Sequence, residues 1–387
     1  MVLYVSGTPL SEAPPCPSAL YQQFPGLREG ASRLVRQMAG AARGADYNRV
    51  SLYVTTREFA TARSSDSRLE MLATDSLANN LAIVLRNNST GHTLLAQVDR
   101  LTSSDVDAMT SSLSPQHGFS SPLSLSLVGS YQDRAGVSLS LLAPILSTLH
   151  HHPHHLDLEV VCIGDMATSP QASSPPLPAL PGLAVSLRTG ELFPLADCSM
   201  EHGPDMDLRT ARTLAASGDK VPGMLAVYDS QREQLSVGPF TWEPMRAVDI
   251  WLGQGDDFLL QSLCPCPESL GQGYPQQLRA ALSLVKSHPY PSVTLFPSDS
   301  PRLYAKAQGG QWVALQQVNT ATVSLVTIIL TLSSLQAPSK LSWYPGPPVK
   351  SESFPCLPTS SLASCHFKTE PLPWQATTAP WTSQAFF

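Results

Sequence analysis

Charged residues are scarce in this chain of 387 amino acids. Lys, Arg, Asp and Glu together make up 14% of the sequence, against an average of about 25% in soluble proteins. The formal net charge is −6 and the isoelectric point is near 5.9, so we expect no basic surface of the kind that holds nucleic acid. Nucleic acid is therefore excluded as the expected partner.

Targeting signals are also lacking. Residues 1–15 contain no basic cluster and only a short apolar run, unlike a secretory signal peptide, and neither end carries a lipidation motif. We therefore expect a cytoplasmic or nuclear protein that has no membrane as a partner. Its seven cysteines are expected to be reduced thiols. Residues 323–335 are an apolar run of 13 with five Ser or Thr. A spanning helix needs about 20 apolar residues, so we favour a tail segment over a membrane anchor.

The apolar pattern predicts an α+β fold, with a mixed β-sheet system and flanking helices in a single main domain at 1–315. Helices are expected at 24–44, 104–113, 135–149, 248–263 and 275–287. Strands, rich in residues that suit a pleated surface, are expected at 49–55, 68–74, 80–86, 92–98, 123–129, 158–164, 293–296 and 301–315, with a hairpin at 184–195. Residues 316–387 contain five charged residues and nine prolines, so we expect an irregular, disordered tail.

Residues 208–257 carry the most specific pattern in the chain. They begin with apolar residues at helical spacing. GMLAVYD at 223–229 is typical of a covered strand, and QLSVGPFTW at 234–242 alternates after a polar turn. The order helix, strand, turn, strand, helix is too particular to be generic fold material.

This block resembles protein N-terminal asparagine amidohydrolases, most clearly through VYDSQREQLSVGPFTWEP and VDIWL. SLYVTTREFA at 51–60 and SHPYPSVTLFP at 287–297 fit the same family, and the resemblance covers most of 1–315. It implies an enzyme that deamidates an exposed N-terminal Asn to Asp and so feeds the N-degron pathway of protein degradation. Its expected partners are proteins or peptides with an exposed N-terminal Asn.

The resemblance also implies where the chemistry belongs. In this family a cysteine nucleophile precedes an IVLR-like strand, and its histidine partner lies on the next strand; such a thiolate–imidazole pair is an activated nucleophile. The family pattern runs without gaps from Leu52 to Asp99 and places the nucleophile position at Asn80 and the general-base position at Gln97. Thr74 and Asp99 flank the pair as polar neighbours.

Neither residue can perform the family's chemistry. The amide nitrogen of Asn80 is delocalised into its carbonyl, and Gln97 has no group that titrates near neutral pH. His92 lies five residues before Gln97, an odd offset that puts it on the opposite face of a strand. The sequence therefore predicts a family member that has lost catalysis.

We expect no compensating nucleophile, cofactor or metal site. All seven cysteines lie outside 17–161, and Cys162 sits in an apolar strand where an inert thiol is expected. Cys264-Pro265-Cys266 lacks the spacing of a metal or redox motif. The histidines of HHHPHHLD at 150–157 are interpreted as a solvated loop rather than as metal ligands.

Three hypotheses remain open. The first is an active N-terminal asparagine amidohydrolase. The second is a non-catalytic homologue that binds protein N-termini or a partner protein, and the third is a protein tethered to a membrane through 323–335. In a triad enzyme, losing the catalytic groups lowers turnover about a millionfold, roughly 8 kcal/mol of barrier. The sequence therefore favours the family assignment together with the loss of its catalysis.

Overall fold

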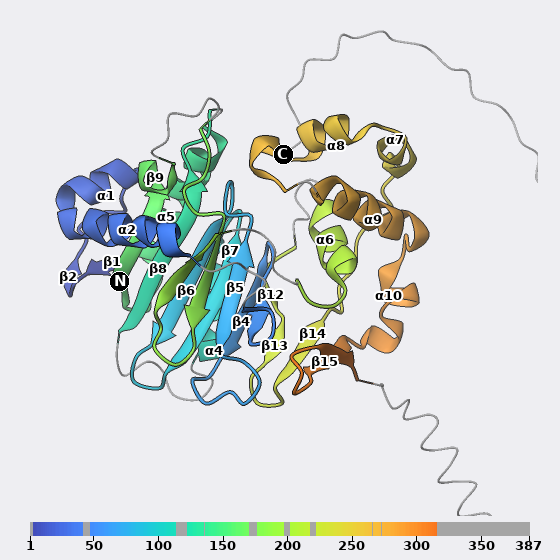
Figure 1. Ribbon diagram of the computed structural model, residues 1–387, viewed down its shortest axis with the longest axis horizontal. Helices are drawn as coiled ribbons and strands as arrows, with labels where there is room; N and C mark the ends of the chain where they lie inside the picture. Colours follow the sequence, from blue (N-terminus) through green and yellow to red (C-terminus); the bar gives the residue numbers. More distant parts are fainter. Residues whose placement is uncertain are drawn as a thin grey trace, which may run out of the picture. The chain divides into compact units, whose positions relative to one another are not determined.

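A computed structural model describes most of the predicted main domain (Figure 1). The described residues are 3–41, 47–113, 122–134, 136–169, 176–196, 202–216, 222–264, 266–271 and 273–315. Within them, no helix has the length and apolar character needed to cross a membrane. The predicted tail at 316–387, with its apolar run, lies outside the described residues, so its disorder and its boundary stay predictions.

The largest sheet contains antiparallel and parallel pairs. Its strand order is β12-β4-β7-β6-β8-β9-β1-β2. The bounds are β1 (Leu3–Val5), β2 (Thr8–Pro9), β4 (Glu58–Ala62), β6 (Leu81–Asn87), β7 (His92–Val98), β8 (Leu123–Tyr131), β9 (Leu156–Gly164) and β12 (Leu225–Ala226). Strands β4, β7, β6 and β8 are antiparallel neighbours, whereas β9 is parallel to both β8 and β1.

A second sheet covers one face of the first. Its order is β11-β10-β5-β3, with β3 (Ser51–Tyr53), β5 (Met71–Asp75), β10 (Gly182–Ser186) and β11 (Leu192–Leu195). Leu72 and Leu183 of this sheet share a buried core with Val84 and Leu95 of the large sheet. Side chains alternate along a strand. Gln97 is two residues after Leu95 on β7, so its side chain faces the same interface between the two sheets.

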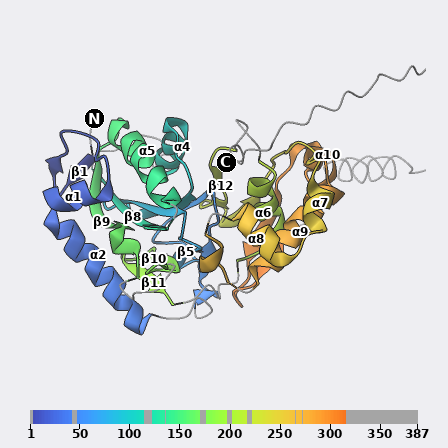
Figure 2. The same cartoon turned by 90° about the horizontal axis from the view of Figure 1, so that it is seen from above.

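Helices cover the other face of the large sheet. They are α4 (Ser103–Leu113) and α5 (Val137–His151). Helices α1 (Pro17–Gln23) and α2 (Pro25–Gln37) lie beside β9, and Ala31 and Leu34 of α2 belong to the core that the large sheet shares with the second sheet. Val106 and Leu142 pack with Ile83 and Leu94 of the sheet. Figure 2 shows α4 and α5 on one side of the large sheet and β10 and β11 on the other. The result is a layer of helices, a large sheet and a smaller sheet.

The second half of the chain adds a third sheet and a group of helices. The sheet has the order β13-β14-β15-β16. Its strands are β13 (Tyr228–Asp229), β14 (Gln234–Val237), β15 (Arg302–Lys306) and β16 (Trp312–Ala314). The helices are α6 (Met206–Leu214), α7 (Val248–Leu252), α8 (Asp256–Leu263), α9 (Tyr274–Ser287) and α10 (Pro291–Thr294). Helices α6 and α9 pack together, and Figure 1 draws this group in yellow and orange.

The predicted α+β class with mixed sheets and flanking helices is confirmed. Helices predicted at 104–113, 135–149 and 275–287 are α4, α5 and α9, within a few residues. Strands predicted at 80–86 and 92–98 are β6 and β7. These elements have strong and regular apolar periodicity, which local sequence reports directly.

Four predicted elements are wrong in detail. The strand at 301–315 is divided into the antiparallel strands β15 and β16. The strand at 293–296 is not formed, because Pro291 begins α10, which ends at Thr294, and the fixed φ and missing N–H of proline suit a helix start. The helix at 248–263 is broken into α7 and α8 around Gly253. The covered strand at 223–229 divides between two sheets, because β12 pairs with β4 whereas β13 pairs with β14.

Candidate functional site

The two predicted catalytic positions meet at the turn that follows β5. Gln97 lies on β7 opposite Ala82 of β6, and its buried side chain donates a hydrogen bond from Nε2 to the carbonyl oxygen of Asp75 at 2.7 Å. Asn80 immediately precedes β6 and donates from Nδ2 towards the next carbonyl, that of Ser76, at 3.5 Å. Both side chains therefore donate hydrogen bonds to consecutive carbonyl oxygens of one turn.

Both carboxamides serve as hydrogen-bond donors to the surrounding backbone and side chains. The Nδ2 of Asn80 also donates to Oγ1 of Thr56 at 3.0 Å, and Thr56 forms an isolated β-bridge with Gln97. The Oε1 of Gln97 is buried and has no hydrogen-bond partner among the described residues. These contacts hold the turn in place, but they supply neither a nucleophile nor a proton acceptor.

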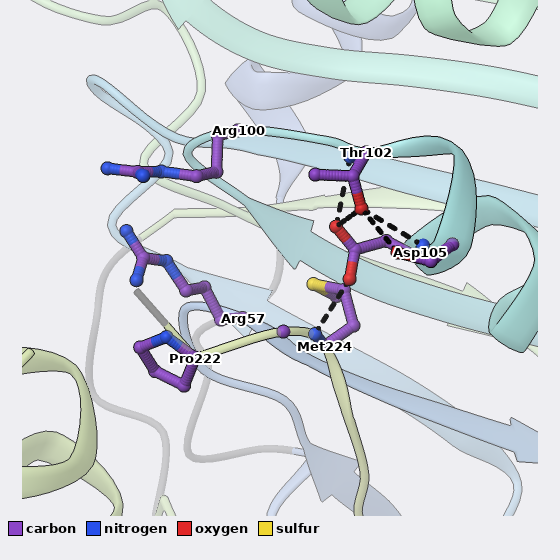
Figure 3. Close-up of a pocket in the computed structure, with 8 residues that line it drawn as sticks. Arg57, Arg100, Thr102, Asp105, Pro222 and Met224 are labelled. Carbon is purple, nitrogen blue, oxygen red and sulfur yellow. Dashed lines mark hydrogen bonds between the residues drawn. The ribbon is translucent and has the colours of Figure 1, made fainter. Parts of the chain in front are cut away.

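The two flanking residues have other partners. Thr74, fully buried on β5, donates its hydroxyl to the carbonyl oxygen of Val54 at 2.8 Å. Asp99 accepts two hydrogen bonds from Arg57, at 2.8 Å from Nε and 2.6 Å from Nη2. Arg57 lines a cavity of about 330 Å³ (Figure 3). Neither Asn80 nor Gln97 lines that cavity.

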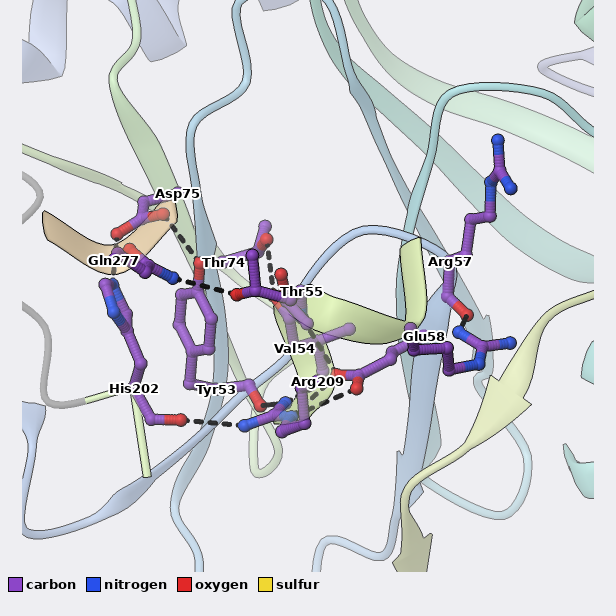
Figure 4. A network of polar contacts seen from close by, with 12 residues as sticks. Tyr53, Val54, Thr55, Arg57, Glu58, Thr74, Asp75, His202, Arg209 and Gln277 are labelled. Carbon is purple, nitrogen blue, oxygen red and sulfur yellow. Dashed lines mark hydrogen bonds and ion pairs between the residues drawn. The ribbon is translucent and has the colours of Figure 1, made fainter. Parts of the chain in front are cut away.

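A buried carboxylate next to the pair has three partners. One oxygen of Asp75, Oδ1, accepts the hydroxyl hydrogens of Tyr53 at 2.7 Å and Ser76 at 3.1 Å. The other, Oδ2, lies 2.8 Å from Nε2 of His202. The His202 ring also contacts the Tyr53 ring, with 4.2 Å between centroids. Figure 4 shows Tyr53 and His202 converging on Asp75.

This cluster contains Ser, His and Asp but lacks the order of a catalytic triad. In a triad the imidazole lies between the hydroxyl and the carboxylate. Here Asp75 lies between Ser76 and His202, and no hydrogen bond joins the serine to the histidine in the described part of the chain. The imidazole therefore cannot take the proton of this hydroxyl in the arrangement observed.

A buried ion pair holds the loop that carries His202. Arg209 of α6 donates from Nε to Oε1 of Glu58 on β4 at 3.0 Å, and both side chains are 1% exposed. Its other nitrogens donate to the carbonyl oxygens of His202 at 2.8 Å and Tyr53 at 2.9 Å (Figure 4). Burial alone would lower the pKa of Arg209, but the Glu58 carboxylate raises it above its ordinary value. Arg209 thus stays charged and ties α6 to the sheet.

Sequence reasoning missed this cluster. Glu58 lies in SLYVTTREFA and Arg209 is the second residue of the 208–257 block, so the segments were singled out but these charges were given no role. A carboxylate and a guanidinium inside otherwise apolar segments were the available signal. Asp75 and His202 had no such signal, since they are 127 residues apart.

The histidine run at 150–157 is not a solvated loop, contrary to the prediction. Helix α5 continues to His151, and His150 and His152 are buried. His150 accepts a hydrogen bond from the backbone N–H of Leu3, and His152 lies 3.0 Å from Asp107. Among the residues described, no group of three or more His, Cys, Asp or Glu side chains is placed to hold a metal ion.

The buried cysteines offer no activated thiol. Cys162 on β9 is fully buried, as expected, and burial raises its pKa to about 12. Burial also raises the pKa of Cys264 to about 12 and that of Cys266 above its ordinary value. A neutral thiol is a poor nucleophile, so these residues do not replace the missing cysteine.

We expect Cys16, which is exposed, to be alkylated at least ~100-fold faster than Cys162 in the folded protein. A pKa of about 12 leaves roughly one thiol in 10,000 ionised at pH 8, and burial hinders access further. Iodoacetamide labelling followed by peptide mass spectrometry measures each site separately. In denaturant the two rates should become similar. Equal rates in the folded protein would contradict the burial of Cys162.

Comparison with known proteins places the site inside one family. The family described as protein N-terminal asparagine amidohydrolase matches residues 42–314. The chain is 30% identical over 264 residues to the protein N-terminal asparagine amidohydrolases of Homo sapiens and Mus musculus, covering 67% of this chain and 83% of each relative. The relative of that name from Arabidopsis thaliana is 23% identical over 281 residues, covering 67% and 80%. The matched range contains every residue of the site.

Proposed function

Because the chain belongs to the protein N-terminal asparagine amidohydrolase family, we propose that it is a member that keeps the fold and has lost the reaction. The observation that carries this proposal is the pair of carboxamides at the nucleophile and base positions. Asn80 and Gln97 are both buried, and both donate hydrogen bonds to the turn after β5. Hydrolysis of an amide needs a nucleophile and a proton acceptor at these positions, and a carboxamide is neither.

The surrounding groups support the same conclusion. His202 hydrogen-bonds to Asp75, and the Ser76 hydroxyl is bound to the other oxygen of that carboxylate rather than to the imidazole. Cys162, the first alternative thiol, is buried with its pKa raised to about 12. With neither group positioned as a replacement, binding rather than turnover is the function left to this site.

We propose that the site's ligand is a protein N-terminus, with a partner protein as the alternative. The buried Oε1 of Gln97 lacks a described partner, and buried acceptors are normally satisfied. An ammonium or amide N–H of a bound peptide would satisfy it. The relatives are named as acting on N-terminal asparagine, so a role beside the N-degron pathway, in the cytoplasm or nucleus, belongs to this proposal.

The test is an assay on a peptide with an N-terminal Asn. Purified full-length protein is expected to leave the peptide unchanged by mass spectrometry, which reports conversion of amide to acid, while the Homo sapiens relative assayed in parallel serves as the comparison. Binding is measured by fluorescence anisotropy with the same peptide and with its N-acetylated form. Robust turnover by the unmodified chain would overturn the loss of catalysis, and equal binding of both peptides would overturn recognition of the N-terminus.

A further inference from the structure

A cavity of about 330 Å³ is lined by Arg57 and does not include the carboxamide pair (Figure 3). Its lining residues come from three separate segments and are Arg57, Arg100, Thr102, Ser104, Asp105, Pro222, Gly223 and Met224. Arg57 has φ of +61°, a left-handed conformation that a residue with a side chain rarely adopts. Such backbone strain is often found at functional sites.

The guanidinium of Arg57 is buried but only partly paired. Its side chain is 8% exposed, and Nε and Nη2 are both taken by Asp99. Its Nη1 is buried and has no hydrogen-bond partner among the described residues. An unpartnered donor on a buried cation is costly, and it is normally satisfied by an acceptor such as an anion or a water molecule.

Further donors surround the same cavity. Arg100 is exposed, and none of the described residues forms an ion pair with it. Figure 3 shows its guanidinium extending in the same direction as that of Arg57. Thr102 directly precedes α4, an 11-residue helix, and accepts hydrogen bonds from the N–H groups of Asp105 and Val106. The N–H groups of Ser103 and Ser104, in the first turn, have no intrahelical acceptor.

The acidic groups near the cavity are already engaged. Asp105 accepts from the backbone N–H and hydroxyl of Thr102 with Oδ2, and from the N–H of Met224 with Oδ1. Asp99 is engaged with Arg57 through both oxygens. The two lining arginines therefore meet two carboxylates whose oxygens are already bound to other donors, whereas Nη1 of Arg57 and the Arg100 guanidinium remain available.

We infer that this cavity binds a phosphate group. A carboxylate is best recognised by the planar fork of two guanidinium nitrogens, but Asp99 occupies that fork of Arg57 and leaves Nη1 alone. A phosphate group has three or more oxygens that accept single donors from several directions. The free Nη1 of Arg57, the Arg100 guanidinium and the first turn of α4 provide such donors, and helix N-termini commonly bind phosphate. The site is separate from the Asn80–Gln97 pair and does not depend on its function.

The test is isothermal titration calorimetry of the full-length protein with inorganic phosphate. Acetate at equal ionic strength is the control, because salt screens the charges of the protein equally in both titrations. We expect saturable binding of phosphate in preference to acetate. Arg100→Gln should weaken phosphate binding about tenfold through loss of a charged hydrogen bond. Arg33→Gln, at an exposed arginine of α2 outside the cavity, should leave phosphate binding unchanged.

A second variant has the opposite expected sign. Asp99→Asn removes a competing negative charge from Arg57, so phosphate should bind several-fold more tightly. O-phosphoserine as a second probe distinguishes the source of the group: tighter binding than inorganic phosphate assigns the site to a phosphomonoester, and equal binding to free phosphate. Equal binding of acetate and phosphate, or Arg100→Gln and Arg33→Gln variants with equal affinity, would overturn the inference.

Discussion

The double variant Asn80→Cys with Gln97→His is expected to hydrolyse a peptide with an N-terminal Asn at least ~100-fold faster than either single variant. A positioned general base contributes about 10²–10⁴-fold. Asn80→Cys alone supplies a thiol that is mostly protonated at neutral pH, and Gln97→His alone supplies a base with nothing to activate. Together they restore an activated nucleophile and an acid for the departure of ammonia, so the effect should exceed the sum of the single changes.

The structure favours this result because the two positions already meet at one turn. The side chains of Asn80 and Gln97 reach the adjacent carbonyls of Ser76 and Asp75, so neither backbone has to move to bring the introduced groups near each other. Mass spectrometry of the peptide follows the conversion. Asn80→Ala with Gln97→His is the matched control, since it keeps the introduced base and removes the thiol.

Two outcomes would contradict the proposed positions. If Asn80→Cys alone matched the double variant, another base would be serving the thiol, and His202 would be the first residue to replace. If the double variant folded with an unchanged thermal transition but produced no acid, the alignment of positions between Leu52 and Asp99 would be wrong.

Arg209→Leu should lower the unfolding temperature by roughly 10 °C. Removing one partner of a buried ion pair costs about 3–5 kcal/mol, because the remaining charge stays buried without compensation, and about 2–4 °C is lost per kcal/mol in domains of this order of size. Glu58 would be that uncompensated charge, and the carbonyl oxygens of Tyr53 and His202 would lose their donor. Differential scanning calorimetry measures the shift.

The control is an ion pair at the surface. Arg232 and Asp229 lie 3.3 Å apart with side chains 74% and 37% exposed, and exposed pairs contribute about 0–1 kcal/mol. Arg232→Leu should therefore hardly change the transition. Replacing both Glu58 and Arg209 by Leu should be less damaging than Arg209→Leu alone, because no buried charge remains. A shift for Arg209→Leu no larger than that for Arg232→Leu would refute the role of the buried pair.

Local sequence patterns predicted helices and strands well where the apolar pattern was strong. They failed where packing against residues distant in sequence determined the structure. Strands β6 and β7 were found because each is a nearly continuous apolar run and one short turn joins them. Strand β4 was not predicted, because EFATA has few β-branched or aromatic residues, yet all five of its residues are buried between β12 and β7. The histidines at 150–152 look polar in sequence, but α5 extends through His151 and two of them are buried.

The sequence by itself determined the family, the α+β class and the absence of a thiol and an imidazole at positions 80 and 97. Residue identity is covalent and does not change on folding, and the register between those positions depends only on a strand, a turn and a strand. Only the tertiary structure decided that Asp75 meets His202, 127 residues away, and that Glu58 meets Arg209, 151 residues away. Periodicity reports which face of an element is buried, but not which distant residue packs against it. The unpaired Nη1 of Arg57 was also decided by the tertiary structure, since only the folded chain brings Asp99 to the other two nitrogens of that guanidinium.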